Sequence, residues 1–203
     1  MNSDGFPDLV TLDTSGFSVR LNNGKGKFSF KHSSSAGFTG LFAIGDFNND
    51  GKPDIVIEGL GIFLGNGDGT VRTPAKTYAD ETPGNLVVAD VNNDHKLDVV
   101  QLYYFPSSGI QIFYGGGDGG VVGPRAFQND APGPFIVTGD FNNDGKVDVA
   151  SVSDQNNGSL TVILGNGNGT FQLPLPGNPP PGELQLELPP ATSPATASST
   201  WRS

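Results

Sequence analysis

The stretch Asp46-Phe47-Asn48-Asn49-Asp50-Gly51-Lys52-Pro53-Asp54 decides the fold because it is repeated. Its pattern of Asp, Asn, Asp and Asp at positions 1, 3, 5 and 9 returns in Asp90–Asp98 and in Asp140–Asp148. A partial copy, Asn2 to Asp8, opens the chain and lacks the first Asp. We call these segments the Asp loops. A motif repeated at regular spacing is typical of a repeat architecture, so we expect several copies of one structural unit.

A second repeated motif follows each Asp loop along the sequence. It is a glycine-rich run, which we call the Gly turn, and its copies are Leu21–Phe28, Leu64–Val71, Tyr114–Val121 and Leu164–Phe171. Each run contains Asn-Gly, Gly-Asp or similar steps that tolerate positive φ, and each follows a short β-rich stretch. We therefore interpret the Gly turns as hairpin turns.

Each unit reads as four short strands. One strand enters the Asp loop, one leaves it, one enters the Gly turn and one leaves that turn. The expected strands around the full Asp loops are Phe42–Gly45 with Asp54–Ile57, Leu86–Ala89 with Asp98–Leu102, and Phe135–Gly139 with Asp148–Val152. The first Asp of successive full loops lies 44 and then 50 residues further on, which is the size of a propeller blade. The pattern predicts an all-β chain of propeller blades, each of four antiparallel strands.

The chain resembles the FG-GAP/VCBS repeats, the blades of integrin-α-like β-propellers. The residues that carry the resemblance are Gly45–Asp54 and Phe63–Gly69, together with their copies, and it covers about residues 1–173. The resemblance implies Ca²⁺ between the first two strands of a blade and a role in extracellular adhesion or ligand binding. It also implies further blades, because such propellers often have seven.

We expect a partial blade at about residues 1–40 and three full blades at about 41–82, 83–132 and 133–173, forming an incomplete propeller. The tail, residues 174–203, is rich in Pro, Ala, Ser and Thr. Such a composition is typical of a disordered linker. However, one choice of codons for residues 191–202, read one base earlier, encodes a further Asp loop, so our hypothesis is that the tail is an out-of-frame reading of another blade. Alternatively, the alternating stretch Leu184–Leu188 supplies a missing first strand and closes a four-bladed ring.

The Asp loops place oxygen-bearing side chains where a hard cation such as Ca²⁺ needs them. We expect the ligands to be the side chains at positions 1, 3, 5 and 9 and the backbone carbonyl at position 7. In the full loops these are Asp46, Asn48, Asp50, Lys52 and Asp54; Asp90, Asn92, Asp94, Lys96 and Asp98; and Asp140, Asn142, Asp144, Lys146 and Asp148. In the partial loop they are Asn2, Asp4, Asp8 and the Phe6 carbonyl, and we expect that site to be weak or empty.

The Asp loops have two alternative interpretations. An EF-hand needs a Glu at position 12 and flanking helices, but Ile57, Gln101 and Ser151 occupy that position. A metal-free Asx turn, in which Asp and Asn bond their own backbone, is the other alternative. Position 6 requires a sharp turn, which Gly51 and Gly145 allow. His95 takes that position in the second loop, so we expect this loop to bind most weakly of the full loops.

Composition restricts the function further. The net charge is −10, and the 11 Lys and Arg residues are scattered, which disfavours binding to nucleic acid. The chain contains no Cys and no long apolar run, so we expect neither disulfides nor a membrane span. The two histidines, His32 and His95, lie in different repeats without a triad-like partner, so we do not expect an enzyme.

These observations predict a calcium-binding propeller segment of an exported or cell-surface protein. Its expected partners are an extracellular protein or carbohydrate ligand and the remaining blades of the propeller. A lectin-like carbohydrate-binding propeller and an accessory module of a larger secreted enzyme are the alternatives. Any signal peptide is expected upstream of this chain.

Overall fold

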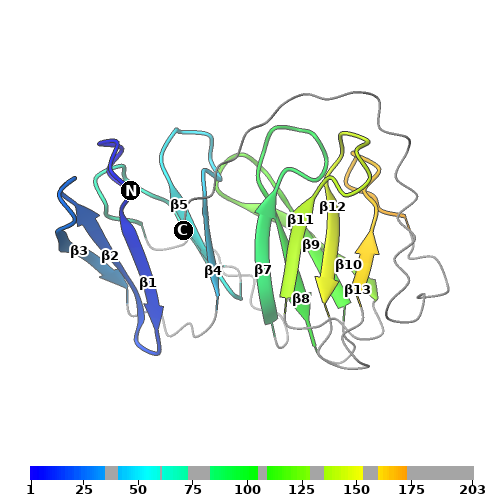
Figure 1. The fold of residues 1–203 in the computed structure, drawn as a ribbon, viewed down its shortest axis with the longest axis horizontal. Coiled ribbons are helices and arrows are strands. Elements are labelled where there is room, and N and C mark those ends of the chain that lie inside the picture. Colours follow the sequence, from blue (N-terminus) through cyan, green and yellow to red (C-terminus); the bar gives the residue numbers. More distant parts are fainter. Residues whose placement is uncertain are drawn as a thin grey trace, which may run out of the picture.

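The computed structural model describes residues 1–34, 41–59, 61–72, 83–104, 109–128, 135–152 and 160–172. These residues form thirteen strands in four separate antiparallel sheets, which follow one another along the chain (Figure 1). In this part of the chain, no helix is long and apolar enough to cross a membrane. The prediction of an all-β chain built from blade-like antiparallel sheets is confirmed.

Each sheet is a run of neighbouring strands, and we call the four sheets blades 1 to 4. Blade 1 contains β1 (Leu9–Asp13), β2 (Gly16–Asn22) and β3 (Phe28–Ser34). Blade 2 contains β4 (Phe42–Gly45), β5 (Asp54–Ile57) and β6 (Gly61–Phe63). Blade 3 contains β7 (Pro83–Ala89), β8 (Asp98–Tyr103), β9 (Gly109–Gly115) and β10 (Val121–Gln128). Blade 4 contains β11 (Phe135–Gly139), β12 (Asp148–Val152) and β13 (Leu160–Ile163).

The Asp loops connect the first two strands of blades 2, 3 and 4. In each of these hairpins the last pair before the loop joins the residue preceding the first Asp to the Asp at position 9, as in Gly45 with Asp54. Ala89 with Asp98 and Gly139 with Asp148 are the equivalent pairs. The expected four strands are described in full in blade 3. In blades 2 and 4 the described part of the fourth strand is a single bridge, Gly65 with Val71 and Gly165 with Phe171.

The hydrophobic core consists of three clusters, and each lies between two successive blades. Between blades 1 and 2, Phe17 and Val19 pack with Ile55, Ile57 and Phe63. Between blades 2 and 3 the cluster contains Phe47, Val56, Ile62, Leu86, Val99, Phe113 and Val121. Between blades 3 and 4 it contains Val91, Val100, Leu102, Ile110, Ile112, Ile136, Val149, Ile163 and Phe171. Full burial of each such side chain contributes about 1.5–3 kcal/mol of transfer free energy.

The strand β5 shows how one blade serves two clusters. Successive side chains of a strand point to opposite faces of the sheet. Ile55 and Ile57 therefore pack toward blade 1, while Val56 between them packs toward blade 3. All three side chains have 0% exposure, because a neighbouring blade covers each face. A continuous apolar run is thus required in the central strand, as expected for a sheet buried on both sides.

Backbone contacts also join successive blades, through the Gly turn of one blade and the Asp loop of the blade before it. The Gly69 N–H donates to the Met1 carbonyl at 3.2 Å, and the Gly119 N–H donates to the Phe47 carbonyl at 3.0 Å. Between blades 3 and 4, the Asn93 side-chain amide donates to the Gly167 carbonyl at 3.2 Å. The Asp loops are therefore part of the interface between blades. No closure between the first and last sheets is detected among the described strands.

Candidate metal loops

The four Asp loops share one backbone shape. Position 4 has positive φ in every copy, at Ser3, Asn49, Asn93 and Asn143 with φ of 55° to 59°. Position 6 has positive φ too, and its residues are Gly5, Gly51, His95 and Gly145. His95 adopts φ of 64° although a non-Gly residue is strained there. The sharp turn predicted at position 6 is therefore present in all four loops, including the one that carries a histidine.

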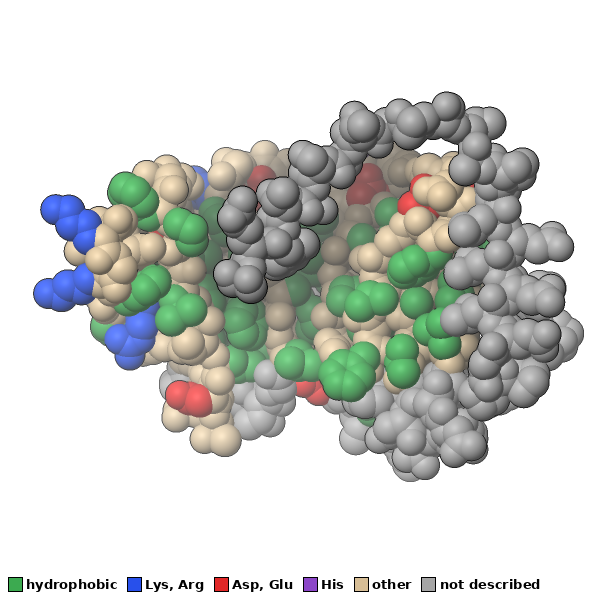
Figure 2. Space-filling view, viewed as in Figure 1, with side chains coloured by type: hydrophobic (Ala, Val, Ile, Leu, Met, Phe, Trp, Pro, Cys, Tyr) green, Lys and Arg blue, Asp and Glu red, His purple; other side chains and the backbone are tan. Residues whose placement is uncertain are grey.

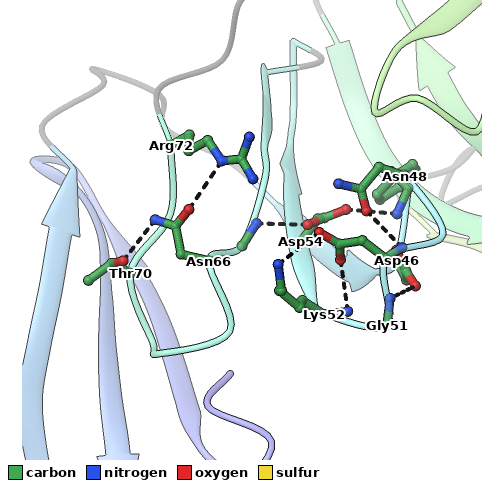
Figure 3. A network of polar contacts seen from close by, with 11 residues as sticks. Asp46, Asn48, Gly51, Lys52, Asp54, Asn66, Thr70 and Arg72 are labelled. Carbon is green, nitrogen blue, oxygen red and sulfur yellow. Dashed lines mark hydrogen bonds and ion pairs between the residues drawn. The ribbon is translucent and has the colours of Figure 1, made fainter.

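The Asp at position 1 organises the turn by accepting hydrogen bonds from it. Asp46 Oδ1 accepts from the Asp50 N–H at 3.1 Å, and Asp46 Oδ2 accepts from the Gly51 N–H at 2.8 Å (Figure 3). Asp90 and Asp140 accept the equivalent pairs of bonds in their loops. Because each carboxylate oxygen has two lone pairs, one on each remains for another ligand.

Positions 3 and 5 continue the same pattern of short-range bonds. Asn48 Oδ1 accepts from the Asp50 N–H at 3.2 Å, and Asp50 Oδ1 accepts from the Lys52 N–H at 3.0 Å. The Lys52 ammonium lies 3.2 Å from Asp50 Oδ2. The loops around Asp94 and Asp144 repeat these contacts with Lys96 and Lys146. These bonds are those of the Asx-turn alternative, and they hold the oxygen-bearing side chains around the loop.

The Asp at position 9 faces the interior of the blade. Asp54 has 0% exposure, and its two oxygens accept from the Phe47 N–H at 2.8 Å and from the Gly65 N–H at 2.7 Å (Figure 3). Asp98 and Asp148 are also 0% exposed and make the same two kinds of bond. Each of these carboxylates joins an Asp loop to the Gly turn of the same blade.

The sequence did not indicate that the position 9 Asp links the Asp loop to the Gly turn, because its partner in the Gly turn is a backbone N–H group. The first glycine of each full Gly turn allows the approach. A Cβ on Gly65 would lie 2.1 Å from the Pro53 carbonyl oxygen, and one on Gly115 or Gly165 would meet the equivalent carbonyl at the same distance. In blade 1, Asn22 stands at this position, and its N–H donates to Asp8 at 2.9 Å. The recurrent glycine directly after the β-rich stretch is the signal that could have indicated a close contact.

The charged form of the position 9 carboxylates is energetically unfavourable in this environment. Burial raises the pKa of Asp54, and the nearby carboxylates of Asp46 and Asp50 raise it further, although its two backbone hydrogen bonds oppose the rise. Burial likewise raises the pKa of Asp98 to about 6, with smaller contributions from Asp94 and Asp90. A carboxylate with a raised pKa beside two others is an environment that a bound cation would relieve.

The partial loop differs at its beginning. The Met1 ammonium lies 2.9 Å from Asp8 Oδ2, and the Asn2 N–H donates to the same oxygen at 3.2 Å. Although burial raises the pKa of Asp8, the hydrogen bonds from Asn22, Asn2 and the Met1 ammonium lower it overall. Asp4 accepts from the Phe6 N–H at 2.9 Å. The expectation that this loop binds a cation weakly stays a prediction.

The structure brings together the predicted ligands within each loop, but not as a closed metal cage. Among the described residues, no group of three or more His, Cys, Asp or Glu side chains is placed to hold a metal ion. In each full loop both the position 1 and the position 9 carboxylates accept backbone N–H bonds on both of their oxygens. The donor set still suits a hard cation, because it consists of oxygens, several with a free lone pair. The predicted ligand residues therefore stay a prediction.

Comparison with known families gives one match. A model of the FG-GAP-like repeat matches residues 1–57 and residues 140–188, which together make up more than half of the chain. The matched segments contain the partial Asp loop, the loop at Asp46 and the loop at Asp140. No curated protein sequence matches the chain.

Proposed function

The chain belongs to the FG-GAP-like repeat family, and on this premise we propose that it is a calcium-stabilised propeller segment that serves recognition or adhesion outside the cell. The observation that carries the proposal is the repetition of one loop shape with the same oxygen-bearing side chains. In each full loop the residues at positions 1, 3 and 5 and the position 7 carbonyl would hold the ion, with the position 9 Asp behind them. FG-GAP repeats often bind Ca²⁺, which supports this assignment.

The ion would act on stability rather than on chemistry. The Asp loops of blades 1 to 3 lie at the interface with the next blade, as the bond from Gly119 to the Phe47 carbonyl illustrates. A cation bound only to the folded state stabilises it by about 2.7 kcal/mol when its free concentration is 100 times the dissociation constant. Millimolar calcium outside cells is sufficient for simple loops of this kind. Calcium would thereby stabilise both the hairpin and the contact between blades.

Recognition is favoured over catalysis by the placement of the candidate catalytic groups. His32 lies beside Phe17 in blade 1, with ring centroids 6.2 Å apart, and His95 lies in an Asp loop of blade 3 with a 96% exposed side chain. The two histidines are thus in different blades. We propose an extracellular protein or carbohydrate as the ligand, and an array of glycans and matrix proteins probes both classes.

Calcium binding is tested by titrating the chelator-treated full chain with Ca²⁺ by calorimetry. The expected result is about three binding events, one for each full Asp loop. Replacing Asp46, Asp90 or Asp140 by Ala one at a time is expected to remove one event each. The exposed Asp13 provides a control, because it accepts from the Ser15 N–H in a hairpin turn outside the Asp loops. Absence of binding at millimolar Ca²⁺, or loss of binding in Asp13→Ala, would contradict the proposal.

A further inference from the structure

The Gly turn of blade 4 contains two consecutive Asn-Gly steps, Asn166-Gly167 and Asn168-Gly169. Such a step can lose its side-chain amide, because the backbone nitrogen of the glycine attacks the side-chain carbonyl carbon of the Asn and glycine has no Cβ to hinder the approach. The described part of the chain contains two more of these steps, Asn23-Gly24 and Asn66-Gly67. The four steps differ in how far the carbonyl is activated and in whether the leaving and attacking nitrogens are free.

The side-chain carbonyl of Asn168 is activated by two hydrogen bonds. Its oxygen accepts from the Thr170 N–H at 3.0 Å and from the Thr170 hydroxyl at 2.6 Å. Attack on the carbonyl carbon turns this oxygen into an oxyanion, and donors aimed at it stabilise the charge that develops. The Asn168 side chain is exposed, so water reaches it. The turn thus places two donors where the reaction needs them.

The side-chain nitrogen of Asn168 is free to leave. Within the part of the chain that the structure describes, it makes no hydrogen bond. By contrast, the Asn166 side-chain nitrogen donates to the Thr170 hydroxyl oxygen at 2.8 Å. The Asn66 side-chain nitrogen donates to the Thr70 hydroxyl oxygen at 2.9 Å. These two amides are held in place by their leaving nitrogens.

The attacking nitrogen, that of Gly169, is free as well. Its N–H donates to no acceptor among the described residues. Gly69 at the same position of blade 2 donates to the Met1 carbonyl at 3.2 Å, and Gly24 donates to Asn22 Oδ1 at 3.0 Å. A bonded N–H fixes the plane of its peptide group, whereas the Gly169 nitrogen can turn toward the reacting carbon. The three requirements therefore coincide at the Asn168-Gly169 step.

We propose that Asn168 is a site of self-modification, at which the chain converts its own side-chain amide into a carboxylate. In the first step the Gly169 nitrogen forms a bond with Cγ of Asn168, and the bond from Cγ to Nδ2 breaks. The proton of the Gly169 N–H leaves with this nitrogen as ammonia. Water then adds to the succinimide ring and opens it to aspartate or isoaspartate. Water is the only other reactant, and no group is oxidised or reduced.

The two products affect the structure differently. Aspartate suits the turn, because Asp68 already occupies this position in blade 2 and accepts the same two bonds from Thr70. Isoaspartate inserts a methylene group into the backbone before Gly169, whose carbonyl accepts from the Tyr114 hydroxyl of blade 3. The isoaspartate product would thereby disturb the contact between blades 3 and 4.

Both products add a negative charge to blade 4. On the face drawn in Figure 2, Lys and Arg side chains gather at the end of the molecule that blade 1 forms, and blade 4 lies at the opposite end (Figure 1). The new carboxylate would therefore lie away from this basic end, which makes the modified chain separable by anion exchange.

The test follows amide loss in the folded full chain at mildly alkaline pH, because a base must remove the proton of the attacking nitrogen. Mass spectrometry of peptides measures each step over time. Asn168 is expected to react faster than Asn23, Asn66 and Asn166. In urea the turns are lost, so the lead of Asn168 is expected to disappear.

The matched control is Asp68→Asn, which makes residues 64–70 identical in sequence to residues 164–170. The Gly69 N–H is bonded to the Met1 carbonyl, so the introduced amide is expected to be lost more slowly than that of Asn168. The Lys31 ammonium, 3.6 Å from Asp68, would favour the developing negative charge and does not account for a slower reaction.

The second pair of variants changes Thr170. Thr170→Val removes the hydroxyl donor and is expected to slow amide loss at Asn168 by up to about tenfold, the effect of one hydrogen bond of ordinary strength. Thr170→Ser keeps a hydroxyl and is expected to retain the native rate. Circular dichroism checks the folding of each variant.

Three results would overturn the proposal. The first is amide loss at Asn168 no faster than at Asn66 in the folded native chain. The second is an equally fast loss at the amide introduced by Asp68→Asn, and the third is an unchanged rate at Asn168 in folded Thr170→Val.

Discussion

The Asp98 carboxylate accepts a hydrogen bond of 2.8 Å from the backbone N–H of Gly115, and this bond joins the Asp loop of blade 3 to its Gly turn. The other oxygen of Asp98 accepts from the Val91 N–H at 3.0 Å. The residue that the pattern predicts as the last metal ligand is therefore also a buried structural link.

Replacing Asp98 by Asn leaves one of its two buried N–H donors without an acceptor. A buried unsatisfied donor costs about 1–3 kcal/mol, and we expect the free energy of unfolding to fall by this amount. Asp118→Asn is the control, because Asp118 is exposed and an Asn oxygen can still accept from the Gly120 N–H. Urea unfolding in chelator measures both variants, and equal stabilities would show that the link contributes nothing.

The titration of Asp98 should make the folded state less stable as the pH rises. Its pKa is raised from 3.8 to about 6 in the folded state, so the stability associated with its protonated form is fully present below about pH 4. This stability is lost as the pH rises through about 6, and a shift of about two units corresponds to about 3 kcal/mol. Carbon-13 NMR of the carboxyl in chelated protein measures the midpoint. The exposed Asp68, whose pKa is lowered chiefly by its hydrogen bonds with Thr70, is the control. A midpoint near 4 for Asp98 would contradict the prediction.

His95→Gly should stabilise the protein. His95 has φ of 64° and a side chain that is 96% exposed, so glycine relieves strain without loss of packing. The gain expected is about 1 kcal/mol, and the loop should also bind Ca²⁺ more tightly. Asn49→Gly at φ of 55° is the matched control, with a smaller gain because Asn tolerates this conformation. Thermal unfolding and calorimetry provide the two readouts. A histidine variant no more stable than the native chain would disprove strain at this position.

Substituting two glycines of similar φ should distinguish the cost of backbone strain from the cost of a steric clash between blades. Gly119 has φ of 86°, and an added Cβ would lie 2.7 Å from Leu64 Cδ2 in the preceding blade. Gly51 has φ of 78°, and its Cβ would meet no atom within 4 Å. We expect Gly51→Ala to cost about 1 kcal/mol from strain, and Gly119→Ala to cost about 1–3 kcal/mol more from overpacking. Denaturant unfolding compares the two variants. The prediction fails if Gly51→Ala is the more destabilising change.

Chelation should lower the melting temperature if the Asp loops hold Ca²⁺ in the native protein. The physical reason is mass action, because an ion that binds only the folded state raises its stability. Differential scanning calorimetry of the full chain in EDTA and in millimolar Ca²⁺ measures the shift, with Mg²⁺ as the control ion. The same melting temperature in EDTA and Ca²⁺ would exclude a structural role for calcium.

Much of the fold was accessible from sequence because it is encoded locally and repeatedly. The Asp loops and Gly turns mark where the chain reverses, so strands such as Phe42–Gly45 and Asp54–Ile57 appear in the structure with the predicted bounds. The burial of Ile55, Val56 and Ile57 on both faces of β5 was less accessible, since it requires a blade on each side. Within the candidate site, the turn at position 6 was predicted correctly, including the strained conformation of His95.

The sequence by itself determined the loops, the turns and the phase of the blades, because the spacing of Asp, Asn and Gly constrains φ and hydrogen bonding within a few residues. Only the tertiary structure decided what each carboxylate faces and which sheet faces are covered. Asp98 meets Gly115 after two strands have folded back, and Phe47 meets Gly119 only when blade 3 packs on blade 2. Such contacts depend on the packing of whole sheets, and burial is a property of both partners rather than of either stretch of sequence.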